Sequence, residues 1–364
     1  MAKKIFVAAT MQNDGKTTVS LGLIAALKMR FGRIGFIKPI GQRYLMEQGY
    51  KVDEDSVLIE EVFGIKCNIK DMSPIAIERG FTERFIEKGT DEDYAGQIRE
   101  AYDRIAKESD LVVIEGTGHA GVGSVFNLSN AAVAKLLDAN VLLISSGGVG
   151  KPIDEIMLNK ALFDKEGVKI AGVIVNKVLP EKYDKVARIV IKGLEQKGLN
   201  VFGALPYQKL LGIPTMREIR EELNIHVFYE GDSFDKPVEN VLVGAMNVRD
   251  ALQFISNNTL MIVPGDRDEM IEAVCKVHSG KMKKGCCFSG LIVSGGILPK
   301  RGSMSRLKKS KIPVLTTKED TYKIASRVNS MIVKLKPQDR EKIRIIVEMV
   351  EKNVDINKVV ASLK

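Results

Sequence analysis

The sequence contains no tryptophan, few histidines and few cysteines. Its 364 residues include three histidines and four cysteines, and the cysteines show no CxxC spacing. This scarcity argues against a disulfide framework and against a structural zinc site, because both need closely spaced cysteine or histidine residues. We therefore expect Cys67, Cys275, Cys286 and Cys287 to be reduced core residues.

Long apolar runs are absent as well. A membrane helix needs about 20 consecutive apolar residues, and no stretch of this sequence approaches that length. The first residues, Met1–Ile5, lead directly into a strand-like segment without the apolar region of a secretory signal. From these absences we expect a cytoplasmic protein with no membrane partner.

Aromatic residues make up only 6% of the chain, although its net charge is +9. Basic clusters such as Arg306, Lys308 and Lys309 have no aromatic residue between them that could stack on bases. Clusters of this kind are typically solvated faces. We therefore expect no nucleic-acid partner.

The composition is that of a globular protein with two domains. Hydrophobic residues make up 45% and charged residues 28% of the chain, which is longer than the about 100–150 residues of a typical domain. In residues 1–206, short β-branched runs alternate with helical periodicity, which predicts an α/β, P-loop NTPase-like parallel sheet with helices on both faces. The expected strands are Lys4–Ala9, Ile34–Ile37, Leu111–Ile114, Val141–Ile144, Ile170–Val175 and Val201–Leu205.

The alternation of predicted strands and helices is interrupted after Pro206. Residues 207–224 are mixed and are interpreted as a linker, and residues 225–336 again alternate short strands with helices, which predicts a second, smaller α/β domain. Residues 337–364 are helical and amphipathic, and we expect them to form a docking or dimer helix. The expected strands of the second domain are Ile225–Tyr229, Leu260–Val263, Gly290–Val293 and Pro313–Leu315.

The segment after the first strand has the pattern of a phosphate-binding loop. Gly15, Lys16 and Thr17 open a predicted helix directly after an apolar strand. Such loops use glycine for close approach of the backbone, lysine to reach the β- and γ-phosphates, and threonine to bind Mg²⁺. Thr10 stands where GxxxxGK[ST] has its first glycine and Asp14 has to point outward, so the match is partial, and a fortuitous helix-opening turn is the alternative. The residues expected to bind ATP here are Asn13, Gly15, Lys16, Thr17 and Thr18.

A second predicted strand, Leu111–Ile114, ends in Glu115 and a glycine-rich loop. A carboxylate at the end of such a strand binds Mg²⁺ directly or through water. We therefore expect Glu115 and Thr17 to be oxygen ligands of the same Mg²⁺ ion, and a solvent-facing glutamate is the alternative. His119, in the loop that follows, is either structural or catalytic.

Three further polar residues are expected at this edge of the sheet. Lys38 follows Ile34–Ile37 and brings a second lysine near the phosphates, which suits phosphoryl transfer to an acceptor oxygen. Either Asp53 or Asp55 could be a second Mg²⁺ ligand, and Asp55 is the one that we expect. Asn176, after Ile170–Val175, has the donor and the acceptor needed to pair with adenine. The alternatives are solvated charges for Lys38 and Asp55 and a turn-forming role for Asn176.

The first half of the chain resembles dethiobiotin synthetase and, more distantly, the cobyrinate amidase family. The motifs that carry the resemblance are the loop Thr10–Thr18, Lys38-Pro39-Ile40, Glu115-Gly116-Thr117-Gly118 and Val175-Asn176, in this order. The resemblance implies an ATP phosphate loop around Lys16, a phosphate-facing Lys38, a magnesium ligand at Glu115 and an adenine-binding Asn176. Asp55 looks like the family's magnesium-binding aspartate. Related domains are commonly dimeric, so the resemblance also implies a homodimer.

The second half resembles the DRTGG domain, with the name-giving motif at residues 265–269. The Thr-Gly-Gly part is absent after Arg267. Asp266 and Arg267 are interpreted either as ligand-binding residues or as a helix-capping aspartate beside a solvated arginine. This order of domains resembles the regulatory, amino-terminal region of long phosphate acetyltransferases. The acetyltransferase domain of that family is missing from these 364 residues, so we expect no acetyl transfer from them.

Two functional hypotheses result. In the first, the protein is a sensor in which Mg-ATP at the phosphate loop alters the DRTGG-like domain or a protein partner of the phosphate acetyltransferase type. In the second, the protein is an ATP-dependent ligase that phosphorylates a carboxylate or carbamate of a small carboxylate or amine substrate. Lys16, Lys38 and Glu115 are then catalytic residues. Steady phosphate release stimulated by a small carboxylate or diamine distinguishes the second hypothesis from the first.

Overall fold

The computed structural model describes residues 2–232, 234–283 and 285–364. It divides into two units, one formed by Met1–Gln208 with Leu335–Lys364 and the other by Lys209–Lys334. The chain therefore leaves the first unit, builds the second, and returns to the first. Within the described ranges, no helix combines the length and the apolar character needed to cross a bilayer.

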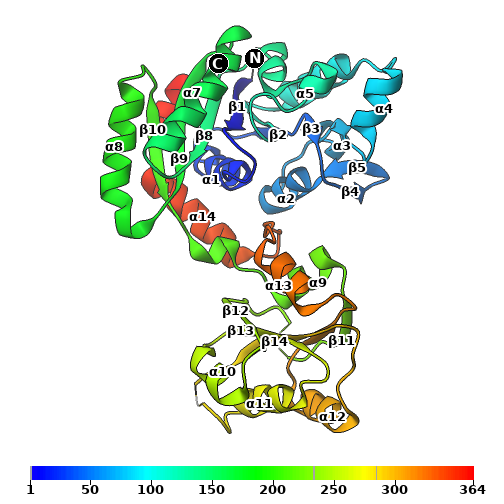
Figure 1. The fold of residues 1–364 in the computed structure, drawn as a ribbon. Coiled ribbons are helices and arrows are strands. Elements are labelled where there is room, and N and C mark those ends of the chain that lie inside the picture. Colours follow the sequence, from blue (N-terminus) through cyan, green and yellow to red (C-terminus); the bar gives the residue numbers. More distant parts are fainter. Residues whose placement is uncertain (1, 233, 284) are drawn as a thin grey trace. The chain divides into compact units, whose positions relative to one another are not determined.

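The first unit is built on a six-stranded parallel sheet with the strand order β10-β9-β8-β1-β7-β2 (Figure 1). All six predicted strands are present, and they are buried because near-continuous apolar runs suit a sheet that is covered on both faces. The predicted P-loop NTPase-like α/β fold is thereby confirmed. The strands are β1 Lys3–Ala9, β2 Ile34–Ile37, β7 Leu111–Glu115, β8 Val141–Ser146, β9 Ile170–Val178 and β10 Val201–Pro206.

Helices cover both faces of this sheet. Helix α1 leads from β1 toward β2, whereas α6, α7 and α8 lead in the opposite direction along the sheet. Since crossovers between parallel strands are right-handed, α1 lies on one face and the other three helices lie on the opposite face. The helices of the unit are α1 Lys16–Lys28, α2 Glu54–Phe63, α3 Ile69–Met72, α4 Phe81–Lys88, α5 Tyr94–Glu108, α6 Asn130–Leu136, α7 Gly150–Lys165, α8 Tyr183–Glu195, α14 Arg340–Asn353 and α15 Ile356–Ser362.

The C-terminal segment packs inside the first unit. Helix α14 contacts α1, and a Cβ added at Gly22 of α1 would lie 2.3 Å from Val350 Cγ2 of α14. The backbone N–H of Lys4 donates to the carbonyl of Lys364 at 3.0 Å, and the N–H of Lys364 donates to the carbonyl of Lys4 at 3.2 Å. The residues expected to be a docking or dimer helix thus form two helices that cover the unit's own sheet (Figure 1).

An insertion between β2 and β7 carries two small sheets that the sequence did not predict. Strands β3 (Ile40–Gly41) and β6 (Ile75–Ala76) pair in parallel, and β4 (Tyr44–Glu47) and β5 (Tyr50–Asp53) form a hairpin. Most hairpin residues are exposed, so the hairpin lacks the buried face that produces an alternating pattern.

The second unit contains a five-stranded sheet with the order β11-β15-β14-β13-β12, in which only β11 runs antiparallel to its neighbour. One apolar cluster packs α10, α11 and α12 against the sheet, and a second packs α9 and α13. Helix α9 lies in residues 207–224, which were expected to be a linker, and its Met216 and Ile219 are buried. The elements are α9 Met216–Leu223, β11 His226–Tyr229, β12 Asn240–Val243, α10 Val248–Phe254, β13 Thr259–Pro264, α11 Asp268–His278, β14 Phe288–Ser294, α12 Arg301–Ser310, β15 Val314–Thr316 and α13 Thr321–Asn329.

The four cysteines are free, as expected from their spacing. Cys275 is buried, whereas Cys67, Cys286 and Cys287 are half-buried. The prediction of core positions is therefore correct for Cys275 and wrong for the other three.

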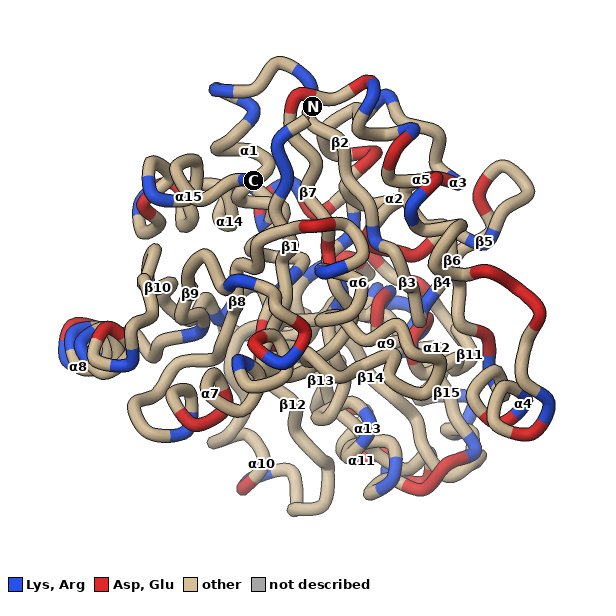
Figure 2. Tube along the Cα trace, turned by 90° about the horizontal axis from the view of Figure 1, so that it is seen from above, with Lys and Arg blue, Asp and Glu red and all other residues tan. Residues whose placement is uncertain are grey.

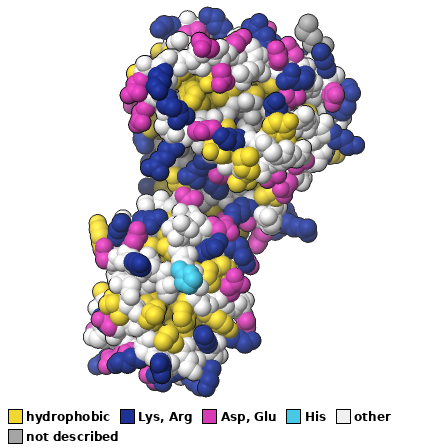
Figure 3. Space-filling model, turned by 90° about the vertical axis from the view of Figure 1, so that its right-hand side faces the viewer, with side chains coloured by type: hydrophobic (Ala, Val, Ile, Leu, Met, Phe, Trp, Pro, Cys, Tyr) yellow, Lys and Arg dark blue, Asp and Glu magenta, His cyan; other side chains and the backbone are white. Residues whose placement is uncertain are grey.

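The surface helices carry both signs of charge. Figure 2 shows Lys and Arg beside Asp and Glu along α4 and α8. Pairs one helical turn apart, such as Lys160–Asp164 and Arg344–Glu348, add to this mixture, and each contributes less than about 1 kcal/mol to stability. Figure 3 shows hydrophobic side chains among Lys, Arg, Asp and Glu side chains on the face that it views.

Candidate functional site

The loop between β1 and α1 lies at the carboxyl edge of the sheet, where open α/β sheets bind ligands. Gly15 directly precedes α1 and has a φ of +94°, a left-handed conformation that favours glycine. A Cβ at this position would lie 2.3 Å from Asn176 Nδ2. Glycine is thus required here both by the backbone angle and by the close approach of β9.

The phosphate loop is held by hydrogen bonds to one of its own side chains. The carboxylate of Asp14 accepts hydrogen bonds from the Thr10 hydroxyl at 2.7 Å and from the Met11 backbone N–H at 2.8 Å. Asp14 is buried, so the prediction that its side chain points outward is wrong. The reason is that Thr10, in the place of the usual glycine, supplies a hydroxyl donor that satisfies the carboxylate inside the loop.

Lys16 is the first residue of α1 and is largely buried. Its Nζ donates to the carbonyl of Gly118, 3.1 Å away, in the loop that follows β7. Burial lowers the pKa of Lys16 to about 8, although the charge of Glu115 acts in the opposite direction. A buried ammonium with few partners gains from an anion placed beside it.

Thr17 and Glu115 meet directly. The Thr17 hydroxyl donates to Glu115 Oε1 at 3.0 Å, and Glu115 is fully buried at the end of β7. The alternative of a solvent-facing glutamate is therefore wrong. Burial raises the pKa of Glu115, while the charge of Lys38 lowers it. Among the described residues, Glu115 Oε2 has no hydrogen-bond partner.

Lys38 extends from the end of β2 into a group of carboxylates. Its Nζ lies 3.3 Å from Asp53 Oδ1 and 3.3 Å from Glu115 Oε1, and it is closest to Asp55. Burial acts to lower the pKa of Lys38, but the charges of Asp55, Glu115 and Asp53 raise it well above its ordinary value. Lys38 and Asp55 are both buried, so the solvated alternatives are wrong for both.

The end of β9 holds the tip of the phosphate loop. Asn176 Nδ2 donates to the carbonyl of Asp14 at 2.8 Å, and its Oδ1 accepts from the Lys177 N–H at 2.9 Å. Lys177 Nζ donates to the carbonyl of Asn13 at 2.6 Å. Thr18 is half-buried in the first turn of α1. An amide oxygen accepts two hydrogen bonds, so Asn176 Oδ1 keeps one lone pair for a further donor.

Two asparagines without a recognised motif hold the loops of the site: Asn130 holds the loop after β7, and Asn159 joins that loop to the phosphate loop. Asn130 on α6 accepts from the Thr117 N–H at 3.0 Å and donates to the Thr117 carbonyl at 2.7 Å. Asn159 on α7 accepts from the Ala120 N–H at 2.8 Å and donates to the Thr10 carbonyl at 3.1 Å. Both are buried polar side chains on helices and therefore need hydrogen-bond partners, but their burial is visible only in the structure.

His119 lies in the same loop but is exposed. Its Nδ1 accepts the backbone N–H of Gly121 at 3.2 Å. The contact stabilises the turn of the loop.

The residues present fit a magnesium ion bound mainly by phosphate and water. Within the described ranges, no group of three or more His, Cys, Asp or Glu side chains is arranged to hold a metal. Mg²⁺ binds its ligands octahedrally at about 2.1 Å, so neighbouring ligand oxygens lie about 3.0 Å apart. The 3.0 Å between Thr17 Oγ1 and Glu115 Oε1 matches this spacing, and Glu115 Oε2 is a buried oxygen without a partner in the described part of the chain.

The expected DRTGG motif surrounds the start of α11. Asp266 is exposed, and no side chain caps the helix. Arg267 Nη2 donates to the carbonyl of Met246 at 2.9 Å. The prediction of a helix-capping aspartate beside a solvated arginine is therefore wrong, because Arg267 is held by the backbone that follows β12.

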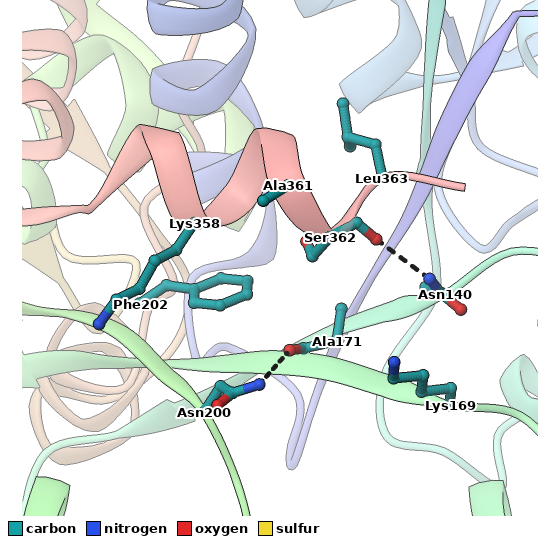
Figure 4. A pocket seen from close by; sticks show the side chains of 9 residues that line it. All are labelled: Asn140, Lys169, Ala171, Asn200, Phe202, Lys358, Ala361, Ser362 and Leu363. Carbon is teal, nitrogen blue, oxygen red and sulfur yellow. Dashed lines mark hydrogen bonds between the residues drawn. The ribbon is translucent and has the colours of Figure 1, made fainter.

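A cavity of about 390 Å³ lies at the opposite edge of the sheet, between α15 and the beginnings of β8, β9 and β10 (Figure 4). Its two lysines, Lys169 and Lys358, are exposed, and Asn140 is bound to the carbonyl of Ser362 at 3.0 Å. The cavity lacks a buried charge and lies at the end of the sheet remote from the phosphate loop.

The parallel sheet, the loop before α1 and the lysine and threonine at its end define the class of P-loop nucleotide-binding domains. Residues 3–215 match the family described as AAA domain, and residues 218–331 match the DRTGG domain. The first match covers more than half of the chain, so the protein belongs to the AAA domain family, with a DRTGG domain after it. The resemblance to P-loop and DRTGG proteins is confirmed.

Curated relatives are similar over nearly the whole chain. The phosphate acetyltransferase of Pseudomonas putida is 28% identical in an alignment 375 residues long that covers 96% of this chain and 50% of that protein. The phosphate acetyltransferase of Nitratidesulfovibrio vulgaris is 26% identical over 98% of this chain and 51% of that protein. The chain thus spans about half the length of these relatives, and the predicted likeness to phosphate acetyltransferases is confirmed.

Solved structures resemble the chain less closely. The MinC:MinD cell division protein complex of Aquifex aeolicus has a TM-score of 0.37 at 14% identity and covers 58% of this chain and 84% of that chain. The CBS and DRTGG domains of Clostridium perfringens pyrophosphatase, complexed with diadenosine tetraphosphate, have a TM-score of 0.26 at 18% identity and cover 48% of this chain and 86% of that chain. With scores this low, neither structure supports a functional assignment.

Proposed function

We propose that the protein binds Mg-ATP at residues 13–18 and acts as a nucleotide-responsive regulatory module. In this proposal the backbone amides at the start of α1 and the Lys16 ammonium bind the phosphates, and Asn176 binds adenine. Thr17, Glu115 and Asp55 bind the metal, directly or through water. The bound nucleotide then alters the DRTGG domain or a protein partner.

The contact between Thr17 and Glu115 carries this proposal. A hydroxyl at the start of α1 and a buried carboxylate at the end of β7 come from separate parts of the chain and lie 3.0 Å apart beside Lys16. Burying a carboxylate costs free energy unless a cation or hydrogen-bond donors compensate its charge. A metal-nucleotide complex supplies that compensation through its cation, and Lys16 meets the phosphate charge.

Calorimetric titration with ATP in the presence and absence of Mg²⁺ tests the proposal. We expect binding that strengthens with Mg²⁺ and is lost in Lys16→Met, a substitution that keeps the length of the side chain and removes its charge. The exposed Lys51, which pairs with Glu78, provides a control through Lys51→Met. A folded protein that fails to bind ATP at millimolar concentration contradicts the proposal.

An ATP-dependent ligase is the second candidate, and the position of Lys38 favours it. A second ammonium 3.3 Å from Glu115 Oε1 lies close to the expected phosphates, as phosphoryl transfer to a small carboxylate or carbamate needs. Lys16, Lys38 and Glu115 are catalytic in this reading. Phosphate release measured with and without small carboxylates or diamines decides between the two: ATP binding without turnover supports the sensor, and stimulated turnover supports the ligase.

The homodimer, the protein partner of the phosphate acetyltransferase type and the cytoplasmic location stay predictions. Exposed apolar residues such as Ile86, Leu158 and Tyr322 are compatible with protein contacts. Light scattering of the purified protein with and without Mg-ATP measures the oligomeric state, for which a dimer is the expected result.

A further inference from the structure

The buried ammonium of Lys38 forms ion pairs with three carboxylates at the carboxyl edge of the first sheet. Lys38 Nζ contacts Asp55, and it lies 3.3 Å from both Asp53 Oδ1 and Glu115 Oε1. The exposed fractions of these four residues are 6% for Lys38 and Asp55, 3% for Asp53 and 0% for Glu115. Water therefore contributes little to their solvation, and their charges are compensated mainly by one another.

Glu115 is the member of this cluster with an unused oxygen. Its Oε1 lies 3.3 Å from Lys38 Nζ, and the nearby Lys16 Nζ donates to the carbonyl of Gly118. The second oxygen of Glu115 has no hydrogen-bond partner among the described residues. Glu115 therefore keeps one oxygen that a cation could use.

The same oxygen of Glu115 is used in two ways. Glu115 Oε1 accepts from Thr17 at 3.0 Å and contacts Lys38 Nζ at 3.3 Å. A magnesium ion held by Thr17 and Glu115 would bring its double charge next to this oxygen. Its double charge then repels an ammonium that shares that oxygen, since repulsion between neighbouring cations is strong where water is excluded.

We propose that the Lys38 ammonium and a divalent cation are alternative counter-ions of Asp55 and Glu115, so that Lys38 leaves these carboxylates when the metal of a nucleotide complex binds. The proposal rests on the Mg-nucleotide binding proposed above and adds a role for Lys38 as the residue that sets metal affinity. Phosphate oxygens of the nucleotide offer the displaced ammonium new partners. Metal therefore binds weakly alone and tightly with nucleotide.

The experiment is a titration of the full chain with Mn²⁺ in the absence of nucleotide, followed by the electron paramagnetic resonance signal of free Mn²⁺. We expect weak binding to the wild type and binding about tenfold or more tighter to Lys38→Met, because the competing charge is gone. This gain in Mn²⁺ affinity is expected to disappear in the double variant Lys38→Met/Glu115→Gln. Lys51→Met, at the exposed ion pair with Glu78, is the matched control and should bind Mn²⁺ like the wild type.

A folded Lys38→Met protein that binds Mn²⁺ no more tightly than the wild type overturns the proposal, and so does a gain that survives in the double variant. If Lys38→Met is unfolded without metal, we expect millimolar Mn²⁺ to restore its circular dichroism spectrum, and no recovery overturns the proposal as well. Lys38→Arg retains the charge and should show no gain. Because no nucleotide is present, failure of ATP binding is seen separately, in the calorimetric titration.

Discussion

At the residue scale, Gly15 is required by both its backbone angle and its surroundings. Its φ is +94°, and an added Cβ would lie 2.3 Å from Asn176 Nδ2. We expect Gly15→Ala to force Asn176 away from the Asp14 carbonyl and to destabilise the protein by about 1–3 kcal/mol. ATP binding should weaken by about tenfold or more as the loop shifts. Urea denaturation and calorimetric titration measure the two effects.

Gly49 in the β4–β5 hairpin is the matched control. Its φ is +85°, but no atom lies within 4 Å of an added Cβ. Gly49→Ala therefore introduces a similar backbone strain without a clash, and ATP binding should stay at the wild-type level. Equal loss of ATP binding in both variants would contradict the role assigned to the Asn176 contact.

His278 makes the stability of the second unit depend on pH. Its Nδ1 accepts the Phe288 N–H at 3.2 Å, and burial, assisted by the charge of Lys236, lowers its pKa. The unfolded chain takes up this proton near the ordinary value of about 6.5, before the folded chain does. The free energy of unfolding is therefore unaffected above this pH and falls as the pH drops below it.

Urea denaturation at pH 7.5 and at pH 5.5 measures this effect. We expect the second unit to lose stability at the lower pH in the wild type, and to lose less in His278→Gln. His226 in the same unit is exposed, so His226→Gln should behave like the wild type. The same pH dependence in His278→Gln as in the wild type would show that the Phe288 contact is not its source.

At the element scale, the strands of the first sheet and the residues at their carboxyl ends were predictable. Buried parallel strands give continuous apolar runs, and their ends meet at one edge, so Lys16, Glu115 and Asn176 were expected near each other. Asp55 and Glu115 were expected at the same edge as Lys38, but direct ion pairs of Lys38 with them and with Asp53 were not predictable. Asp53 and Asp55 reach it through the exposed β4–β5 hairpin, which carries no periodic signal.

The packing of α1 against α14 was not predictable either, because the two helices are more than 300 residues apart. A Cβ at Gly22 would lie 2.3 Å from Val350 Cγ2 and 3.3 Å from the Ile346 carbonyl. Alanine usually stabilises a helix interior relative to glycine by about 0.5–1 kcal/mol. Here we expect Gly22→Ala to destabilise by about 1–3 kcal/mol through overpacking.

Thermal unfolding of Gly22→Ala measures this loss, and Gly302→Ala on α12 is its control. The nearest atom to an added Cβ at Gly302 is the end of the flexible Arg306 side chain at 3.7 Å. Gly302→Ala should therefore stabilise the protein slightly, by about 0.5–1 kcal/mol. A stabilising effect of both substitutions would contradict the α1–α14 contact.

At the scale of the whole molecule, the first unit is assembled from both ends of the chain. Gly203 forms a β-bridge with Val354, and Lys364 pairs with Lys4. We expect a chain that ends at Lys334 to lose the cooperative unfolding transition of the first unit, because α14 and α15 no longer cover the sheet. Differential scanning calorimetry measures this, and an unchanged transition temperature would contradict the assignment of residues 335–364 to that unit.

The central claim is that a triphosphate lies over the first turn of α1 with its metal held by a hydroxyl and a carboxylate. A crystal structure of the protein grown with Mg²⁺ and a non-hydrolysable ATP analogue tests it directly. We expect phosphate density against the backbone amides of residues 13–18 and a metal between Thr17 and Glu115. A loop that stays closed over Asp14 and Met11 at millimolar nucleotide, or a nucleotide bound elsewhere in the chain, would contradict the account.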